Sequence, residues 1–222
     1  SAVLYLFRAR WRTSIYPAAE AMTIFPVLTP GLFPLIHAGR MWFAYFLLPY
    51  PNQRYLWPNF KSPLVWDVFA ISTYLSISTV FFIVGLVPDL AALRDASTGW
   101  RRTVFGMLAL GWEGSDRQWR HYRRAYGLFA ALATPLVLSV HSVVSWDFAM
   151  ALVPGWHSTL FAPFFVDGAI FSGFAMVLIL VLPMRHFFGL HAYIRDRHLD
   201  FMAKLILVTG LVLTYFYICE LF

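Results

Sequence analysis

Long apolar runs separated by short polar segments dominate the chain. Five such runs carry few charges, with bounds at about 16–36, 64–87, 126–153, 164–183 and 201–222. A helix needs about 20 mainly apolar residues to cross the hydrocarbon core of a bilayer. The pattern therefore predicts an all-α integral membrane protein, a polytopic transmembrane helix bundle with about five spans. Both ends of the sequence are apolar, so we expect residues 1–222 to be the central transmembrane part of a longer subunit.

The composition supports this prediction. Of the 222 residues, 60 % are hydrophobic and only 13 % are charged, and the mean hydropathy is +0.65. Soluble domains carry roughly a quarter charged residues, which argues against an ordinary soluble enzyme and a disordered region. The single cysteine excludes a disulfide scaffold and cannot hold an iron–sulfur cluster, which needs several thiolates. The alternative, a soluble protein with buried core helices, would extract without detergent.

Basic residues are distributed unevenly between the connecting segments. Fourteen of the 17 lie before the first run, between the second and third, or around the start of the fifth. Cytoplasmic loops carry an excess of Lys and Arg, so we expect these arginine-rich segments to be cytoplasmic. The net charge of +6 is then a topology signal. Nucleic-acid binding by segment 94–124 is the weaker alternative.

Ionisable residues inside the membrane form a second pattern. Such side chains are costly there and are functional candidates by default. The predicted topology brings six of them to a similar depth near the outer face: His37, Arg40, Asp67, His141, Asp147 and Asp167. Helical spacing also predicts two polar stripes, Asp67–Tyr74–Ser78 and Thr134–His141–Ser145, which together could line a cavity. A carboxylate and an imidazole can each accept a proton, as oxidation of a hydroquinone requires.

Each candidate also has a structural interpretation that the sequence leaves open. Asp67 and Asp167, near the starts of their spans, also fit helix caps. His141 also fits a hydrogen bond to a backbone carbonyl, and Asp147 a solvated position at the interface. Arg40 also fits a snorkelling side chain.

Other residues of the apolar runs fit more than one role. Trp66 suits an aromatic belt at the interface as well as a binding site. Three prolines of the first run, Pro26, Pro30 and Pro34, predict a kinked helix suited to a cavity wall. Glu20 and Glu220 have no assignment beyond a proton relay.

Several motifs resemble the polysulfide reductase, NrfD-like family of membrane subunits. They are IHAGR (36–40), WPNFKSPLVWDVFA (57–70), ATPLVLSVHSVVSWDFA (133–149) and PGWHSTLFAPFFVDGAIFSGFAMV (154–177). Within that family they are most similar to the ActC quinol-oxidising subunit of bacterial alternative complex III. The resemblance covers nearly the whole sequence.

This resemblance implies specific roles for the residues above. The chain would oxidise quinol near the periplasmic face, with His37 and Asp67 as the catalytic residues. The quinol-binding candidates are Arg40, Trp66, Tyr74 and His141, and the proton-path candidates are Asp147 and Asp167. No residue of this chain would bind a metal.

The resemblance also implies cofactors, partners and a location. The substrate would be a quinol, with menaquinol favoured, and this chain would hold no metal or haem. Iron–sulfur clusters and c-type haems would belong to a periplasmic iron–sulfur subunit and a multihaem cytochrome c subunit, and a paralogous NrfD-like subunit would lie beside the chain. The complex would sit in the bacterial inner (plasma) membrane and serve respiratory or photosynthetic electron transport. Quinol oxidation would release protons and could be linked to their translocation, and the chain would be active only within the complex.

Two alternative functions remain open from the sequence. A haem-bearing, cytochrome-b-like membrane anchor is suggested by His37 and His141 at similar depth, and a pyridine haemochrome spectrum would test it. A proton-conducting or transport bundle is suggested by the kinked first run and the intramembrane carboxylates. No inverted repeat is visible in the sequence, which counts against the second alternative.

Overall fold

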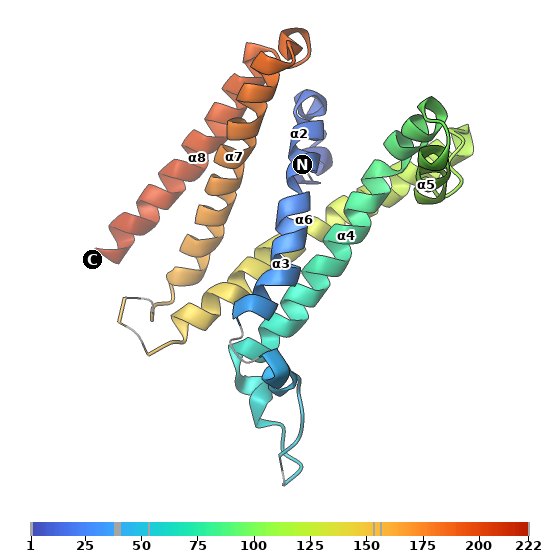
Figure 1. Ribbon diagram of the computed structural model, residues 1–222. Coiled ribbons are helices and arrows are strands. Elements are labelled where there is room, and N and C mark those ends of the chain that lie inside the picture. Colours follow the sequence, from blue (N-terminus) through green and yellow to red (C-terminus); the bar gives the residue numbers. More distant parts are fainter. Residues whose placement is uncertain (1, 38–40, 53, 153, 156, 222) are drawn as a thin grey trace.

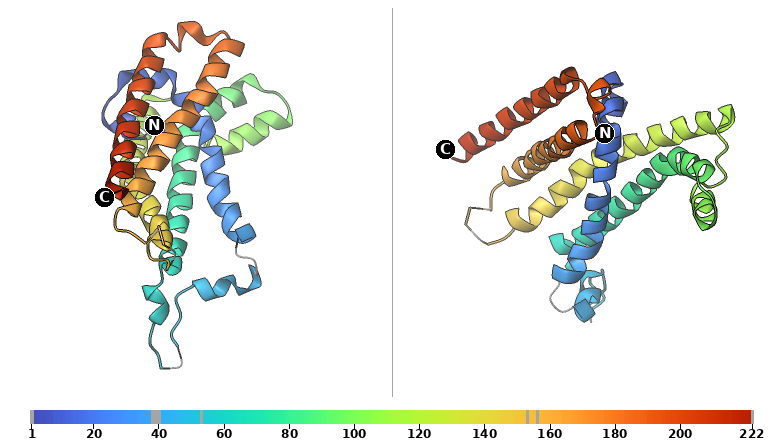
Figure 2. Two further views of the ribbon diagram at one scale, coloured as in Figure 1. Left: turned by 90° about the vertical axis from the view of Figure 1, so that its left-hand side faces the viewer. Right: turned by 45° about the horizontal axis from the view of Figure 1, so that its top comes forward.

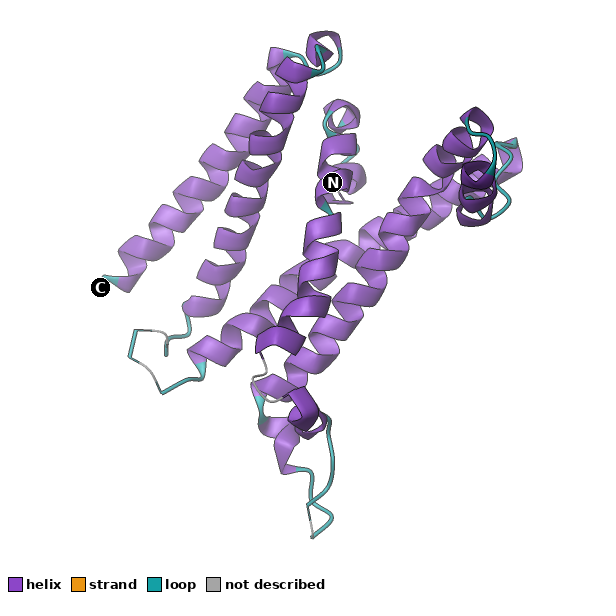
Figure 3. Cartoon of the chain, viewed as in Figure 1, coloured by secondary structure: helices purple, strands orange, loops and turns teal. Residues whose placement is uncertain are grey.

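The computed structural model describes residues 2–37, 41–52, 54–152, 154–155 and 157–221 (Figure 1). These ranges are helical with connecting loops, and they contain no strand (Figure 3). Four long helices form an antiparallel row, α4 (Pro63–Ala96), α6 (Asp116–Ala149), α7 (Phe161–Phe187) and α8 (Asp196–Glu220). Each of the four is long and apolar enough to cross a membrane. The predicted fold class, an all-α membrane bundle, is confirmed.

The N-terminal part lies against this row in four short pieces. They are α1 (Ala2–Leu6), the 3₁₀ helix η1 (Arg10–Ser14), α2 (Tyr16–Met22) and α3 (Ile24–His37). Helix α1 packs on α6, α2 on α7, and α3 on α4. The single helix expected over 16–36 is interrupted at Thr23. Pro26 explains the interruption, because it has no N–H for the carbonyl of Met22 and its ring clashes with that carbonyl.

The remaining elements lie outside the apolar runs. They are α5 (Trp100–Leu108) and the 3₁₀ helices η2 (Met41–Leu47), η3 (Pro58–Lys61) and η4 (Leu190–Ala192). Helix α4 continues past the run that ends at 87, and α6 begins well before the run that starts at 126. Helix α6 begins with a capping box. The Ser115 hydroxyl accepts a hydrogen bond from the backbone N–H of Gln118, and Oε1 of Gln118 accepts one from the backbone N–H of Ser115.

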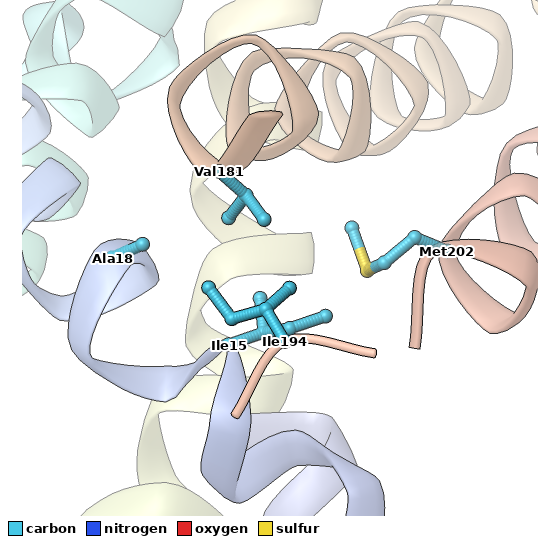
Figure 4. Packing of buried hydrophobic residues seen from close by; sticks show 5 residues of the cluster. All are labelled: Ile15, Ala18, Val181, Ile194 and Met202. Carbon is cyan, nitrogen blue, oxygen red and sulfur yellow. The ribbon is translucent and has the colours of Figure 1, made fainter. Parts of the chain in front are cut away.

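A small apolar core joins α2, α7 and α8 (Figure 4). It consists of Ile15, Ala18, Val181, Ile194 and Met202, all at most 4 % exposed. Because Ile15 and Ile194 belong to connecting segments, this core fixes those segments against the ends of the helices.

Most large apolar side chains nevertheless face outward. The accessible surface is 15230 Å², whereas a soluble monomer of 25.5 kDa would expose about 10,400 Å². Many exposed side chains are large and apolar, and those on the long helices include Leu128, Ile179 and Leu211. Such a surface suits lipid or neighbouring membrane proteins.

The two ends of the bundle differ in charge. The α4–α5–α6 connection, the α7–α8 connection and η1 all lie at one end, and they carry the arginine-rich segments (Figures 1 and 2). We call this the arginine end. The elements η2 and η3 and the α6–α7 connection lie at the opposite end. We call that the aspartate end, because Asp67, Asp147 and Asp167 lie in the parts of α4, α6 and α7 nearest to it.

Candidate functional site

Two carboxyl groups meet at the aspartate end. Because α4 and α6 are antiparallel, Asp67 near the start of α4 comes beside Asp147 near the end of α6, and the two carboxyls interact directly. On each of them Oδ1 is buried and has no hydrogen-bond partner among the described residues. We call these residues the aspartate pair. Like charges in contact repel, so the pair is suited to sharing a proton.

Two tryptophans flank the aspartate pair. The rings of Trp66 and Trp146 meet edge to face, with centroids 6.0 Å apart at 82°. Trp66 also donates from Nε1 to the carbonyl of Phe60 at 2.7 Å, which ties η3 to the start of α4. The site therefore contains the dipeptide Trp-Asp twice, once from each helix.

Two residues close in sequence to the aspartate pair are buried. Ser145 of α6 is completely buried, and its hydroxyl donates to the Ser142 carbonyl at 2.6 Å, so it exposes no unsatisfied polar group. Val65 of α4 is 2 % exposed. Pro63 occupies the first turn of α4, where its missing N–H costs no hydrogen bond. These features place Asp67 on an ordered helix rather than in a loop.

His141 lies apart from the aspartate pair. Its Nδ1 is 2.7 Å from the carbonyl of Val137, and its ring centroid is 6.4 Å from that of Phe165 on α7. A carbonyl can only accept, so Nδ1 carries the hydrogen of this contact. The backbone-bonded interpretation of His141 is confirmed, and no contact between His141 and the aspartate pair is recorded in the described part of the chain.

The capping interpretation of Asp67 and Asp167 is wrong. The N-cap of α4 is Ser62 and that of α7 is Leu160, so both aspartates lie beyond the first helical turn. Asp167 instead holds its Oδ2 buried, with no hydrogen-bond partner among the described residues. Its role in a proton path stays a prediction.

One of the two polar stripes contributes to a recorded cavity. Tyr74 interacts with Ser78 one turn further along α4. Ser78 lines a cavity of about 60 Å³, but the second stripe contributes none of the residues lining that cavity. The other lining residues are Tyr16, Glu20, Thr23, Phe81, Phe82 and Tyr126. At this cavity Ser78 therefore lies beside residues of α2, α4 and α6 that do not belong to the second stripe, and a cavity lined by both stripes stays a prediction.

Two candidates cannot be placed. His37 is the last residue of α3, but its side chain lies outside the described part of the structure. Arg40 lies outside the described residues altogether. Their roles stay predictions. Among the residues that the structure does describe, no group of three or more His, Cys, Asp or Glu side chains could hold a metal ion.

Sequence reasoning missed two features of the site. Trp146 was not a candidate, although the repeated Trp-Asp dipeptide at 66–67 and 146–147 is a readable signal. The contacts of Glu20 with Tyr16 and Gly85 were also missed. Glu20 and Gly85 lie on different helices and far apart in sequence, so no local spacing could reveal their contact.

Comparison with known proteins identifies the family. A family model described as "Polysulphide reductase, NrfD" matches residues 1–222. A protein of Halobacterium salinarum, described as a putative membrane subunit of dimethyl sulfoxide reductase, is 29 % identical over 185 residues. That match covers 81 % of this chain and 37 % of the relative, so the chain spans well under half of the relative's length. The chain belongs to the polysulphide reductase NrfD family and is a multi-pass membrane protein.

Proposed function

We propose that this chain is the quinol-binding and quinol-oxidising membrane subunit of an electron-transport complex of the alternative complex III type. The observation that carries the proposal is the aspartate pair, with its unpartnered buried oxygens and the two flanking tryptophans. The ActC-like motifs and the membership in the NrfD family support it.

The residues at the aspartate end suit the chemistry of quinol oxidation. Oxidation of a quinol to a quinone releases two protons and two electrons. Oδ1 of Asp67 and Oδ1 of Asp147 are buried and lack hydrogen-bond partners among the described residues, so in this proposal the quinol head group displaces neighbouring side chains to reach them. A positioned carboxylate can then remove a quinol proton. The rings of Trp66 and Trp146 offer an aromatic surface for the flat head group.

The remaining candidates take supporting roles in this proposal. His37 acts with Asp67 in deprotonating the quinol, and Arg40 and Tyr74 help to bind it. His141 presents Nε2 as a second proton acceptor on α6, and Asp147 and Asp167 carry protons away from the site.

Electrons leave through partner proteins. A periplasmic iron–sulfur subunit accepts them at the aspartate end and passes them to c-type haems of a multihaem cytochrome, while a paralogous NrfD-like subunit lies beside the chain. The relative's description as a membrane subunit of a reductase supports a role as one subunit of an oxidoreductase complex. In this proposal the quinol is menaquinol, the aspartate end faces the periplasm, and the chain is active only in the complex.

Asp67→Asn in the full-length chain tests the proposal. The amide keeps the shape of the carboxyl but cannot take up the quinol proton, so quinol oxidation by the purified complex should fall about 100-fold or more. Asp200→Asn is the matched control, because Asp200 is exposed and paired with Lys204 at 2.7 Å on the other end of the bundle. Co-purification of the iron–sulfur partner checks assembly. Full activity of an assembled Asp67→Asn complex would overturn the proposal.

A further inference from the structure

Another carboxyl group, that of Glu20, is partly buried where α2, α4 and α6 meet. The Tyr16 hydroxyl donates to Oε1 of Glu20 at 2.7 Å. The same Oε1 lies against the backbone of Gly85, where an added Cβ would overlap it and would stand 3.2 Å from the Tyr16 hydroxyl. Only glycine at position 85 leaves room for the carboxyl in this place.

The surroundings of Glu20 contain room for water. The adjoining cavity of about 60 Å³ is lined by Thr23, Ser78 and Tyr126, besides Tyr16 and two phenylalanines. A site that holds water needs about 10–15 Å³ of space open to a water-sized probe, so this cavity has room for water. The Thr23 hydroxyl donates to a backbone carbonyl and the Ser78 hydroxyl lies beside Tyr74, so both oxygens can also accept from such water.

The carboxyl of Glu20 forms no ion pair among the described residues, and the Arg12 guanidinium lies 5.7 Å from the centroid of the Tyr16 ring without pairing with Glu20. No lysine, arginine or histidine of the described ranges lies within ion-pairing distance of it. The titratable groups that face it are Tyr16 on α2, Asp89 on α4, and Tyr122 and Tyr126 on α6. All four are neutral or acidic. A carboxylate that is partly shielded from water and has no ion-pair partner is unfavourable, which suits this group to binding a proton.

Glu20 and the aspartate pair lie toward opposite ends of the bundle. Gly85 follows Asp67 by 18 residues along α4, which corresponds to about 27 Å at 1.5 Å per residue. This separation is close to the roughly 30 Å thickness of the hydrocarbon core. Asp89, exposed one turn beyond Gly85, lies between Glu20 and the arginine end.

We propose that Glu20 is a proton-binding site of the bundle, which exchanges its proton through water with the solvent at the arginine end. The Tyr16 hydroxyl and the backbone of Gly85, which carries no side chain, hold the Glu20 carboxyl beside the cavity. Asp89 is the surface group through which the proton enters and leaves. The proposal goes beyond quinol oxidation and does not depend on it.

Infrared difference spectroscopy of the purified complex with the full-length chain tests the proposal. Spectra are recorded during a pH titration without quinol, so their outcome is independent of the proposed function. Glu20→Gln should remove one carbonyl stretching band of a protonated carboxylic acid, and this band should shift in D₂O in the unmodified complex. Glu220→Gln is the matched control, because it makes the same change on an exposed glutamate and should leave the band in place.

Two further variants keep the test decisive if Glu20→Gln does not assemble. Tyr16→Phe removes the hydrogen bond to Oε1 with little change in shape, and Gly85→Ala forces the carboxyl to turn away. Each should shift the frequency of the Glu20 band. An unchanged set of bands in assembled Glu20→Gln, or in both Tyr16→Phe and Gly85→Ala, would overturn the proposal.

Discussion

Aspartates of this chain differ mainly in their partners. Asp95, Asp196 and Asp200 each pair with an arginine or lysine at the arginine end, at 2.6 to 2.8 Å. Asp67, Asp147 and Asp167 each keep one buried oxygen without a hydrogen-bond partner among the described residues. The first three are satisfied by their surroundings, whereas an unsatisfied buried oxygen is costly and indicates a group kept for another purpose.

The contact between Asp67 and Asp147 predicts that their substitutions are not additive. Residues that act as one unit lose the shared function with the first change, so a second change adds little. Asp67→Asn and Asp147→Asn should each slow quinol oxidation, and the double variant should be about as slow as the slower single one. Rates of the purified complexes measure this.

A third aspartate supplies the control for this pair. In the double variant that combines Asp67→Asn with Asp200→Asn, the two substitutions should change the rate of quinol oxidation independently. The reason is that Asp200 lies on α8 at the other end of the bundle. If the double variant of Asp67 and Asp147 loses activity by the product of the two single fold-losses, the two residues do not share a role.

Only part of the site was predictable from single residues. The common depth of Asp67 and Asp147 follows from the alternation of spans. Their contact does not follow, because helical spacing assigns residues to a face but does not say which neighbouring helix that face meets. For this reason His141, at the predicted depth, faces Phe165 of α7, and Glu20 makes unforeseen contacts.

At the scale of elements, apolar runs locate the spans but not the helix ends. Helix α4 reaches Ala96 and α6 begins at Asp116, because polar residues continue a helix outside the membrane with solvated side chains. Hydropathy therefore underestimates helix length. It also misses α5, which mixes polar and apolar residues and contains no long apolar run. The Ser115–Gln118 capping box is the local signal that marks the start of α6.

Arg94 connects the end of α4 to the segment after α5. Its Nη1 donates to the carbonyl of Trp112 at 2.9 Å, and its Nε and Nη2 contact Asp95. Arg94→Met should loosen this connection and speed tryptic cleavage at Arg101 and Arg102 several-fold, because local opening exposes the chain to protease. Mass spectrometry of timed digests measures the rate.

The matched control removes another arginine from the same end. Arg124→Met takes away an exposed arginine for which no side-chain contact is recorded among the described residues, so cleavage at Arg101 and Arg102 should keep its rate. Equal cleavage rates in the two variants would show that Arg94 does not hold the segment.

At the scale of the whole molecule, the fold is a slab rather than a closed globule. Its row of helices buries little inside itself, and the core at Ile15 and Val181 lies near one end. The distribution of buried residues therefore does not indicate which end of the bundle faces the cytoplasm, whereas the distribution of charged residues does. The arginine-rich segments gather at one end, and an excess of basic residues marks the cytoplasmic side of membrane proteins.

This asymmetry predicts opposite labelling of the two ends. In full-length protein lacking native cysteines, Thr159→Cys marks the aspartate end and Thr98→Cys the arginine end, and both positions are exposed. A membrane-impermeant maleimide should label Thr159→Cys in intact spheroplasts and Thr98→Cys only after lysis. Detergent-solubilised samples show whether each cysteine can react. The reverse pattern would place the aspartate pair toward the cytoplasm. A periplasmic iron–sulfur partner could then not accept electrons directly from a quinol at Asp67.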